Sequence, residues 1–186
     1  MTEGLRRLIF LTGRPGVGKT SVLLRAVDIL QGKGFEVGGM ISREIREQGV
    51  RVGFEIMDLQ TGAQGWLAHV DQPTGPRISK YRVNLSDLNN VGAGSILRAV
   101  EKAHIVVVDE IGPMELVSSD FKDAVMQGVE SRKVMTGTIH YTARDPLIDK
   151  IKAHEDSEVF EVTRQNRSRL HTLMVGRVLQ HLENQS

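Results

Sequence analysis

A chain of 186 residues that is 40% hydrophobic is long enough to bury the core of one domain, so we expect residues 1–186 to form a single domain. Its formal net charge of +1 gives no general attraction to nucleic acid or to an anionic membrane, and the lack of cysteines excludes disulfides and thiolate metal sites. Only four apolar residues follow Arg6-Arg7, too few for a signal peptide or a membrane span. We therefore expect a soluble, cytoplasmic protein, with its oligomeric state left open.

The first predicted strand, Leu8–Leu11, leads into the most informative motif of the chain. It is followed by Gly13-Arg-Pro-Gly-Val-Gly-Lys-Thr20, and then by apolar residues with helical spacing from Ser21 to Leu30. A strand, the pattern G-x-x-x-x-G-K-[ST] and a helix, in this order, predict a phosphate-binding loop, or P-loop. A glycine-rich surface turn is the alternative, and a chance match in a chain of this length is on the order of one in a hundred.

Each part of this motif has a chemical reason. The glycines let the backbone turn tightly and aim successive N–H groups at one anion, which the positive end of the following helix dipole also attracts. Lys19 would reach the β and γ phosphates, and the Thr20 hydroxyl would bind Mg²⁺. The predicted nucleotide-binding residues of the motif are Gly13, Arg14, Pro15, Gly16, Val17, Gly18, Lys19, Thr20 and Ser21.

A β-rich segment follows the first helix. Phe35–Ile41 reads as a strand, and Val50–Leu59 alternates between apolar and polar residues. We predict a hairpin whose tip is the charged segment Arg43–Gly49, followed by a further antiparallel strand over Gln64–Val70. This places an antiparallel β insertion at about residues 43–70, on the edge of a parallel sheet.

Strands and helices alternate in the rest of the chain. After a loop rich in Pro and Gly, the predicted strands are Tyr81–Leu85, Ile105–Asp109, Val134–Ile139 and Val159–Val162. The predicted helices are capped by, or begin at, Ser86 or Asp87, Ser119, Asp145-Pro146 and Asn166. Gly92 and Gly94 weaken the first of these helices. The alternation predicts an α/β fold with a mostly parallel sheet flanked by helices, and ligands at the carboxyl ends of its strands.

The strand Ile105–Asp109 is apolar on both faces, as buried parallel strands are, and it leads into two acids. Beside a P-loop, Asp109 is the predicted Mg²⁺ ligand, directly or through water, and both acids are predicted to lie at the nucleotide. Glu110 is the predicted catalytic base, because a carboxylate at the mouth of the site can orient and deprotonate a water against the γ-phosphate. Without the P-loop, Asp109 and Glu110 would indicate only the ordinary end of a surface strand. For Glu115, in the next loop, we expect a solvated side chain, with a supporting acid of the site as the alternative.

Four further residues are candidates, each with a structural alternative. His140 follows Val134–Ile139 at the same sheet edge and would sense the γ-phosphate or the attacking water, or else hydrogen-bond to backbone. Arg144, in the next loop, is placed to reach the transferring phosphoryl group, unless it forms a surface salt bridge. Asn166 and Arg167 follow the last strand, where Asn can hydrogen-bond a base and Arg can stack on it. Helix capping and a solvated arginine are the alternatives for this pair.

With both motifs in place, the chain resembles the small P-loop nucleoside-triphosphatases of archaea and thermophilic bacteria, whose vertebrate relatives are called cancer-related nucleoside-triphosphatases. The resemblance covers nearly the whole chain, and its most specific part is Asp-Glu-Ile-Gly-x-Met-Glu together with a glycine-bearing hairpin. The matching segments are Gly13–Thr20, Gly38–Arg43, Arg51–Phe54, Lys80-Tyr81, Val108–Leu116 and Asn166-Arg167.

The resemblance implies a Mg²⁺-dependent enzyme that hydrolyses ATP, GTP and other nucleoside triphosphates to the diphosphate and phosphate, with loose selectivity for the base. It also implies the P-loop nucleoside-triphosphatase fold in which an extra strand, here Val134–Ile139, lies between the phosphate-binding strand and the Asp109 strand. Glu110 is then the catalytic acid. The family usually has Lys after Asp-Glu-Ile-Gly, where this chain has Pro113. The resemblance therefore does not imply a positively charged side chain at this position.

Two other functions stay open from the sequence. A small-molecule or nucleotide kinase would share the P-loop and hold an acceptor near residues 71–79. Such an enzyme usually needs a mobile, arginine-rich lid, whereas the arginines at positions 43, 46, 77 and 82 of this chain are scattered. A nucleotide-dependent switch module would expose a large apolar patch around the hairpin Phe54–Trp66, and that patch would change with the bound nucleotide.

Overall fold

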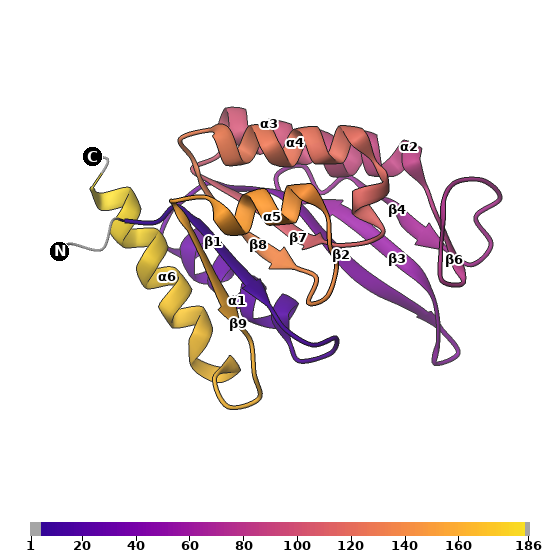
Figure 1. Cartoon of the computed structure of the whole chain (residues 1–186), viewed down its shortest axis with the longest axis horizontal. Coiled ribbons are helices and arrows are strands. Elements are labelled where there is room, and N and C mark those ends of the chain that lie inside the picture. Colours follow the sequence, from indigo (N-terminus) through magenta and orange to yellow (C-terminus); the bar gives the residue numbers. More distant parts are fainter. Residues whose placement is uncertain (1–4, 185–186) are drawn as a thin grey trace.

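The computed structural model describes residues 5–184, and their strands join in one nine-stranded sheet (Figure 1). The strands, in chain order, are β1 (Leu8–Thr12), β2 (Val37–Glu47), β3 (Val50–Asp58), β4 (Gln64–His69), β5 (Arg77–Ile78), β6 (Tyr81–Val83), β7 (Ile105–Ile111), β8 (Val134–Ile139) and β9 (Ser157–Glu161). The helices are α1 (Lys19–Gly32), α2 (Leu85–Asp87), η1 (Leu88–Ala93), α3 (Gly94–Lys102), η2 (Glu115–Val117), α4 (Ser119–Glu130), α5 (Pro146–Ala153) and α6 (Arg167–Glu183). The order across the sheet is β5-β6-β4-β3-β2-β7-β8-β1-β9.

The strands β2, β7, β8, β1 and β9 run parallel to one another. β8 lies between β1, which leads into the P-loop, and β7, which carries the acid pair, so the predicted inserted strand is confirmed. These three strands are buried almost throughout, which explains why their sequences are nearly continuous apolar runs. Because the strands are parallel, their carboxyl ends meet at the edge of the sheet where the P-loop begins.

Helices cover both faces of the parallel part of the sheet (Figure 1). α3, α4 and α5 pack on one face, over a core to which β7 contributes Val106 and Val108. α1 and α6 pack on the other face, where β7 contributes Ile105 and Val107. Successive side chains of a strand point to opposite faces, so a strand covered on both sides needs apolar residues at every position. None of the helices between residues 5 and 184 has the length and apolar character needed to cross a membrane.

The antiparallel part of the sheet begins within β2. This strand leaves β7 and continues against β3 as far as Glu47, so the turn is Gln48-Gly49 and the predicted tip Arg43–Gly49 is wrong. Arg43 lies directly opposite Glu55 in β3 and forms an ion pair with it. Opposite charges that face each other across two strands keep a polar segment in β structure. The short strands β5 and β6 carry the antiparallel pairing beyond the predicted limit at residue 70.

Two helices start earlier than predicted. Asn84, not Ser86 or Asp87, caps the helix after β6, because its side chain accepts the backbone N–H of Asp87. Ser118, not Ser119, caps α4 by accepting an N–H of the first helical turn. An N-cap side chain has to lie two or three residues before the N–H that it accepts, which selects the earlier residue in both cases.

The weakness predicted at Gly92 and Gly94 coincides with a change of helix type. Residues Leu88–Ala93 form the π-helical segment η1 between α2 and α3. A Cβ atom at Gly92 would lie 3.0 Å from Met40 Sδ, so glycine lets this turn pack closely on β2. Near the other end of the chain, β9 runs over Ser157–Glu161 rather than over the predicted Val159–Val162.

Glycines on both sides let β7 approach its neighbours near the acid pair. A Cβ atom at Gly39 in β2 would lie 2.0 Å from the carbonyl oxygen of Val107, and φ at Gly39 is +115°. A Cβ atom at Gly137 in β8 would lie 2.0 Å from the carbonyl oxygen of Val108. A side chain at either position would therefore displace the strand that carries Asp109.

The substitution Gly39→Ala tests this constraint. We expect it to lower the free energy of unfolding by about 3–5 kcal/mol, because the new methyl group collides with backbone and the residue must keep a positive φ. Gly176→Ala is the matched control, since a Cβ there has open space in the middle of α6. The control should stabilise the protein by about 0.5–1 kcal/mol. Urea unfolding measures the change in unfolding free energy of both variants. A Gly39→Ala protein as stable as the parent would contradict the close packing of β2 on β7.

Candidate active site

The P-loop joins β1 to α1 and leaves N–H groups free for a ligand. Gly13, Gly16 and Gly18 have φ values of +147°, +74° and +108°, which L side chains rarely adopt. A Cβ atom at Gly13 would also lie 2.8 Å from the carbonyl oxygen of Val162. Gly18 is the N-cap of the 14-residue helix α1, where no side chain caps the helix and the first turn holds no acid. The N–H groups at this helix end are therefore open to an anion.

Lys19 is held across the loop by two oxygen atoms. Its side chain is buried, and its Nζ donates to the carbonyl oxygen of Gly13 at 3.1 Å and lies 3.5 Å from Glu110 Oε2. An ammonium group has three N–H donors and no acceptor, so donor capacity remains for a phosphate oxygen. The flanking residues Arg14 and Ser21 are exposed beside it.

Asp109 connects α1, β7 and β8. Its Oδ1 accepts the Thr138 hydroxyl at 2.5 Å and the Thr20 hydroxyl at 3.3 Å. The side chain is 1% exposed, and its second oxygen, Oδ2, is buried without a hydrogen-bond partner among the described residues. Burial raises the pKa of Asp109 to about 6, and the hydrogen bonds from Thr138 and Thr20 oppose that rise.

These donors suit Mg²⁺. A free carboxylate oxygen beside a threonine hydroxyl is the oxygen chemistry that this ion prefers, and an orphaned buried oxygen such as Asp109 Oδ2 needs a partner. The described residues hold no cluster of three or more His, Cys, Asp or Glu side chains arranged for a metal. At phosphate sites Mg²⁺ commonly takes only one or two protein ligands, and the substrate phosphates supply others.

Glu110 lies at the end of β7, partly exposed, with its carboxylate toward Lys19. A Cβ atom at Gly112 would lie 3.0 Å from Glu110 Oε1 and 3.3 Å from the Cβ of His140. The absence of a side chain at position 112 thus leaves room for the carboxylate. A partly exposed carboxylate that faces the P-loop lysine can contact water on one side and a phosphate-bound site on the other.

Glu115 differs from our expectation of a solvated side chain. It begins η2 and is only 5% exposed, and the backbone N–H groups of Glu115 itself and of Gly112 are near enough to its carboxyl group to oppose a rise in its pKa. Burial is the main reason that its pKa rises to about 8, with smaller contributions from the charges of Glu110 and Asp109. The expectation failed because a loop residue is usually solvated, whereas this loop turns its acid back under the sheet edge.

The structure places the other predicted residues at the same edge, in different situations. His140 follows β8, and its Nδ1 accepts the backbone N–H groups of Thr142 and Ala143, so Nε2 carries the proton and is the donor. Arg144 is exposed and makes neither a hydrogen bond nor an ion pair with any residue from 5 to 184. The surface salt bridge that we considered for Arg144 is therefore absent from the described residues.

Asn166 and Arg167 lie where β9 leads into α6. The Asn166 side chain holds the loop together, since its Oδ1 accepts the N–H of Thr163 and its Nδ2 donates to the carbonyl oxygen of Glu161. It does not form a side-chain cap for α6. The Arg167 guanidinium donates to the carbonyl oxygen of Val17 in the P-loop at 3.3 Å, so this arginine is neither buried nor free in solvent.

Thr138 is a residue of the site that the sequence analysis did not select. It is fully buried in β8 and donates to Asp109. The signal was present, because Thr136 and Thr138 are polar residues in a strand that is otherwise apolar or glycine. We selected His140 as the polar group at this strand end that would sense the γ-phosphate or the attacking water. Its position in the sequence does not decide which side chain contacts Asp109.

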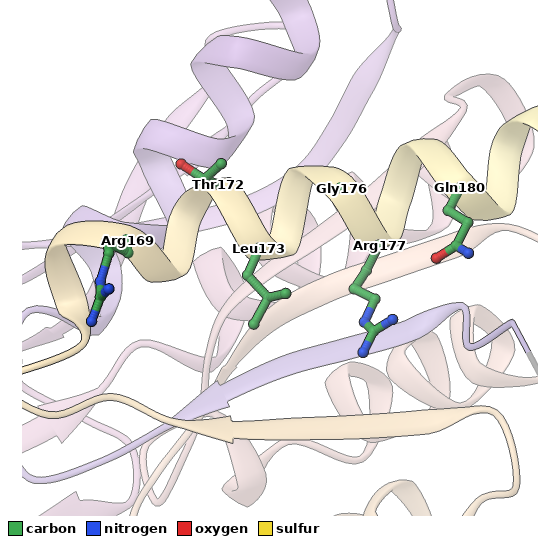
Figure 2. A pocket seen from close by; sticks show the side chains of 6 residues that line it. All are labelled: Arg169, Thr172, Leu173, Gly176, Arg177 and Gln180. Atoms are coloured by element: carbon green, nitrogen blue, oxygen red, sulfur yellow. The ribbon is translucent and has the colours of Figure 1, made fainter. Parts of the chain in front are cut away.

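A surface depression of about 580 Å³ lies along α6, lined by residues of this helix alone (Figure 2). Figure 2 shows the side chains of Leu173, Arg177 and Gln180 on the same side of the helix. None of the residues that we predicted to bind nucleotide lines this depression.

The fold and its glycine loop place the protein among the P-loop proteins that bind nucleotides. Comparison with known families narrows this class. The sequence model of the family described as NTPase matches residues 8–175, and the chain belongs to this family.

This chain is similar to individual members of the family over most of their length. The chain is 46% identical over 161 residues to the nucleoside-triphosphatase THEP1 of Thermofilum pendens, covering 86% of this chain and 88% of the relative. It is 42% identical to the THEP1 of Methanosarcina acetivorans, covering 94% and 98%. Among solved structures, a human cancer-related nucleoside triphosphatase superposes with a TM-score of 0.79 at 33% identity, over 92% of this chain and 97% of the other. The resemblance noted in the sequence is confirmed.

Asp109→Asn should stabilise the nucleotide-free protein at alkaline pH. The pKa of this carboxyl rises from its ordinary value of 3.8 to about 6 on folding, so the folded state binds its proton more tightly and stability is lost as the pH rises through that window. Asparagine keeps the oxygen that Thr20 and Thr138 contact but carries no charge.

We expect Asp109→Asn to gain on the order of 3 kcal/mol in unfolding free energy near pH 8, and much less near pH 4. Urea unfolding at both pH values measures the gain. Asp28→Asn, an exposed position on α1, is the control and should show none. A variant less stable than the parent near pH 8 would refute the account of Asp109 as an under-partnered buried charge.

Proposed function

We propose that this protein is a Mg²⁺-dependent enzyme that hydrolyses nucleoside triphosphates, ATP and GTP among them, to the diphosphate and phosphate. The observation that carries the proposal is the Glu110 carboxylate, held 3.5 Å from the P-loop ammonium of Lys19 at the carboxyl edge of the sheet. The whole chain would act as one hydrolytic domain. We place it in the cytoplasm, an expectation that its cysteine-free sequence allows.

Binding of the triphosphate follows from the loop. The N–H groups at the start of α1, from Gly18 to Thr20, and the dipole of this helix attract the phosphates, and Lys19 adds a full positive charge. Lys19 already contacts the loop and Glu110, so its ammonium is fixed before the ligand arrives. Fixed charges stabilise the developing negative charge of phosphoryl transfer without reorganising at the moment of reaction.

Thr20 and Asp109 are the residues that would hold Mg²⁺. Bound there, the ion would supply positive charge to the β and γ phosphates. The protein's contribution is to keep Asp109 oriented: two hydroxyl groups occupy Oδ1 and leave Oδ2 available. The raised pKa of Asp109, about 6, still leaves the carboxylate mostly ionised near pH 7.

Glu110 is the proposed general base. It would orient a water molecule and take its proton while the water oxygen bonds to the γ-phosphorus and the bond to the β–γ bridging oxygen breaks. The products are the nucleoside diphosphate and phosphate, and Glu110 returns the proton to solvent through its exposed side. Assistance of this kind contributes about 10²–10⁴ in rate.

The base of the nucleotide is proposed to lie beside Arg167. This guanidinium already rests on the P-loop at Val17, next to the open end of α1, and a planar cation can stack on any base. Asn166 is engaged in holding its own loop, so few side chains at this edge read the base. Loose base selectivity follows. Arg144, exposed and unpaired among residues 5–184, and the Nε2 donor of His140 are the proposed groups for the γ-phosphate.

Phosphate release from ATP, GTP, CTP and UTP with Mg²⁺, and with no acceptor added, tests the proposal. Glu110→Gln should bind nucleotide as the parent does and release phosphate about 10²–10⁴ times more slowly. Glu130→Gln, an exposed glutamate at the end of α4, is the matched control and should keep the parent's rate. If Glu110→Gln turns over like the parent, Glu110 is not the base. If the parent binds nucleotide but releases no phosphate, a kinase with an unknown acceptor or a switch replaces the hydrolase.

Lys19→Ala tests the phosphate contact separately. Removing the ammonium should weaken Mg²⁺–ATP binding at least about tenfold, because a charge-assisted contact to phosphate is lost, and turnover should fall with it. Arg25→Ala removes an exposed cation from the same helix and should leave binding as in the parent. Titration calorimetry distinguishes the two variants, and equal affinities in both would remove Lys19 from the site.

A further inference from the structure

Glu115 is a buried acid for which the hydrolysis mechanism has so far no use. It is 5% exposed and lies at the start of η2, and the backbone N–H of Gly112 is close enough to its carboxyl group to oppose the rise of its pKa. The loop between them, Gly112–Met114, is also closed by the hydrogen bond from Leu116 N to the carbonyl oxygen of Gly112. The Glu115 carboxyl group therefore lies against the backbone that immediately follows the acid pair.

The side chains of Glu115 and Glu110 meet at Gly112. A Cβ atom built on that glycine would lie 3.3 Å from Glu115 Oε2, 3.0 Å from Glu110 Oε1 and 3.3 Å from the Cβ of His140. Both carboxyl groups thus border the space that a side chain at position 112 would occupy. A shift of this loop would therefore change the space beside the Glu110 carboxylate.

The charge state of Glu115 follows from its surroundings. The acids that face it are Glu110 and Asp109, both on β7. The nearby cation, Lys19, forms its ion pair with Glu110, and the nearby imidazole of His140 accepts N–H groups at Nδ1, as a neutral ring does. Among residues 5–184 no cation pairs with Glu115, and no hydrogen bond joins it to Asp109 or Thr20. A buried carboxylate without a cation, close to two other acids, keeps its proton.

We propose that Glu115 is a positioning residue for the hydrolysis proposed above, an uncharged buried carboxyl that holds Gly112–Met114 beneath Glu110. Its proton keeps a third negative charge away from the bound triphosphate. Ionisation of Glu115 would place a negative charge next to Glu110 and would weaken the burial of the Glu115 carboxyl group. The inference rests on the proposed function, so one of its two tests is independent of turnover.

The first test is the pH dependence of unfolding of the nucleotide-free protein. The pKa of Glu115 is about 8 in the folded protein and 4.5 ordinarily, so stability should fall as the pH rises through this interval. In Glu115→Gln the fall should be smaller, and the remainder belongs to Asp109 and other groups. Urea midpoints at about pH 5 and about pH 9 give the two slopes. Equal slopes in the parent and in Glu115→Gln would overturn the proposal, since no buried proton would then reside on Glu115.

The second test is the pH profile of hydrolysis. The parent's kcat should decline above about pH 8, whereas Glu115→Gln, whose side chain cannot ionise, should lack that decline. The ratio of kcat near pH 9 to kcat near pH 7 should therefore be about threefold higher or more in Glu115→Gln than in the parent. Glu115→Ala should lose about 10–100-fold in kcat with KM little changed, because the loop under Glu110 is released. We expect Glu115→Gln to have a kcat much closer to that of the parent than Glu115→Ala has. This result would show that an uncharged side chain of the same shape is what the site requires.

Three results overturn the positioning role. They are identical pH profiles for the parent and Glu115→Gln, a Glu115→Ala protein with the parent's kcat, and a folded Glu115→Gln protein as slow as Glu115→Ala. Glu130→Gln serves again as the control for an exposed glutamate. If the parent releases no phosphate at all, the proposed function itself has failed. The unfolding slopes then still report whether the buried proton exists, so the two failures are distinguishable.

Discussion

The site depends on one carboxylate, because Asp109 is where the phosphate-binding helix and the two central strands are joined by side chains. Thr20 from α1 and Thr138 from β8 both donate to the same oxygen of this residue of β7. Two hydroxyl groups on one oxygen fix the carboxyl plane, and the second oxygen has no hydrogen-bond partner among residues 5–184. Burial of this carboxyl group raises its pKa to about 6.

The other charged groups of the site, Lys19, Glu110 and Glu115, differ in the partners that surround them. Lys19 lies between the P-loop carbonyl of Gly13 and the Glu110 carboxylate, so one cation serves both the loop and the acid at the mouth of the site. Glu115 is buried and pairs with no cation among residues 5–184, which favours its neutral form. Burial thus raises the pKa of two neighbouring acids to different extents, to about 6 for Asp109 and to about 8 for Glu115.

Close backbone packing keeps these groups in place. Gly39 and Gly137 allow β2 and β8 to approach β7 at the carbonyl groups of Val107 and Val108, just before the acid pair. Gly112, just after the pair, leaves room for the Glu110 carboxylate. The glycines outside the P-loop therefore allow the close strand packing that sets the position of the backbone carrying Asp109 and Glu110.

The sequence by itself determined the P-loop, the alternation of strands and helices and the acid-bearing strand, because each is a local pattern: a glycine spacing, a period of apolar residues, an apolar run that leads into acids. It also indicated the family. Only the tertiary structure decided that Thr138 contacts Asp109, that Glu115 is buried, and that Asn166 holds its own loop. The predicted hairpin formed, but its tip was placed too early for the same reason, since the opposite charge of Glu55 across the sheet helps to keep the charged segment at Arg43 in a strand. Contacts between residues far apart in sequence set burial and partners, and these decide what each polar side chain can do.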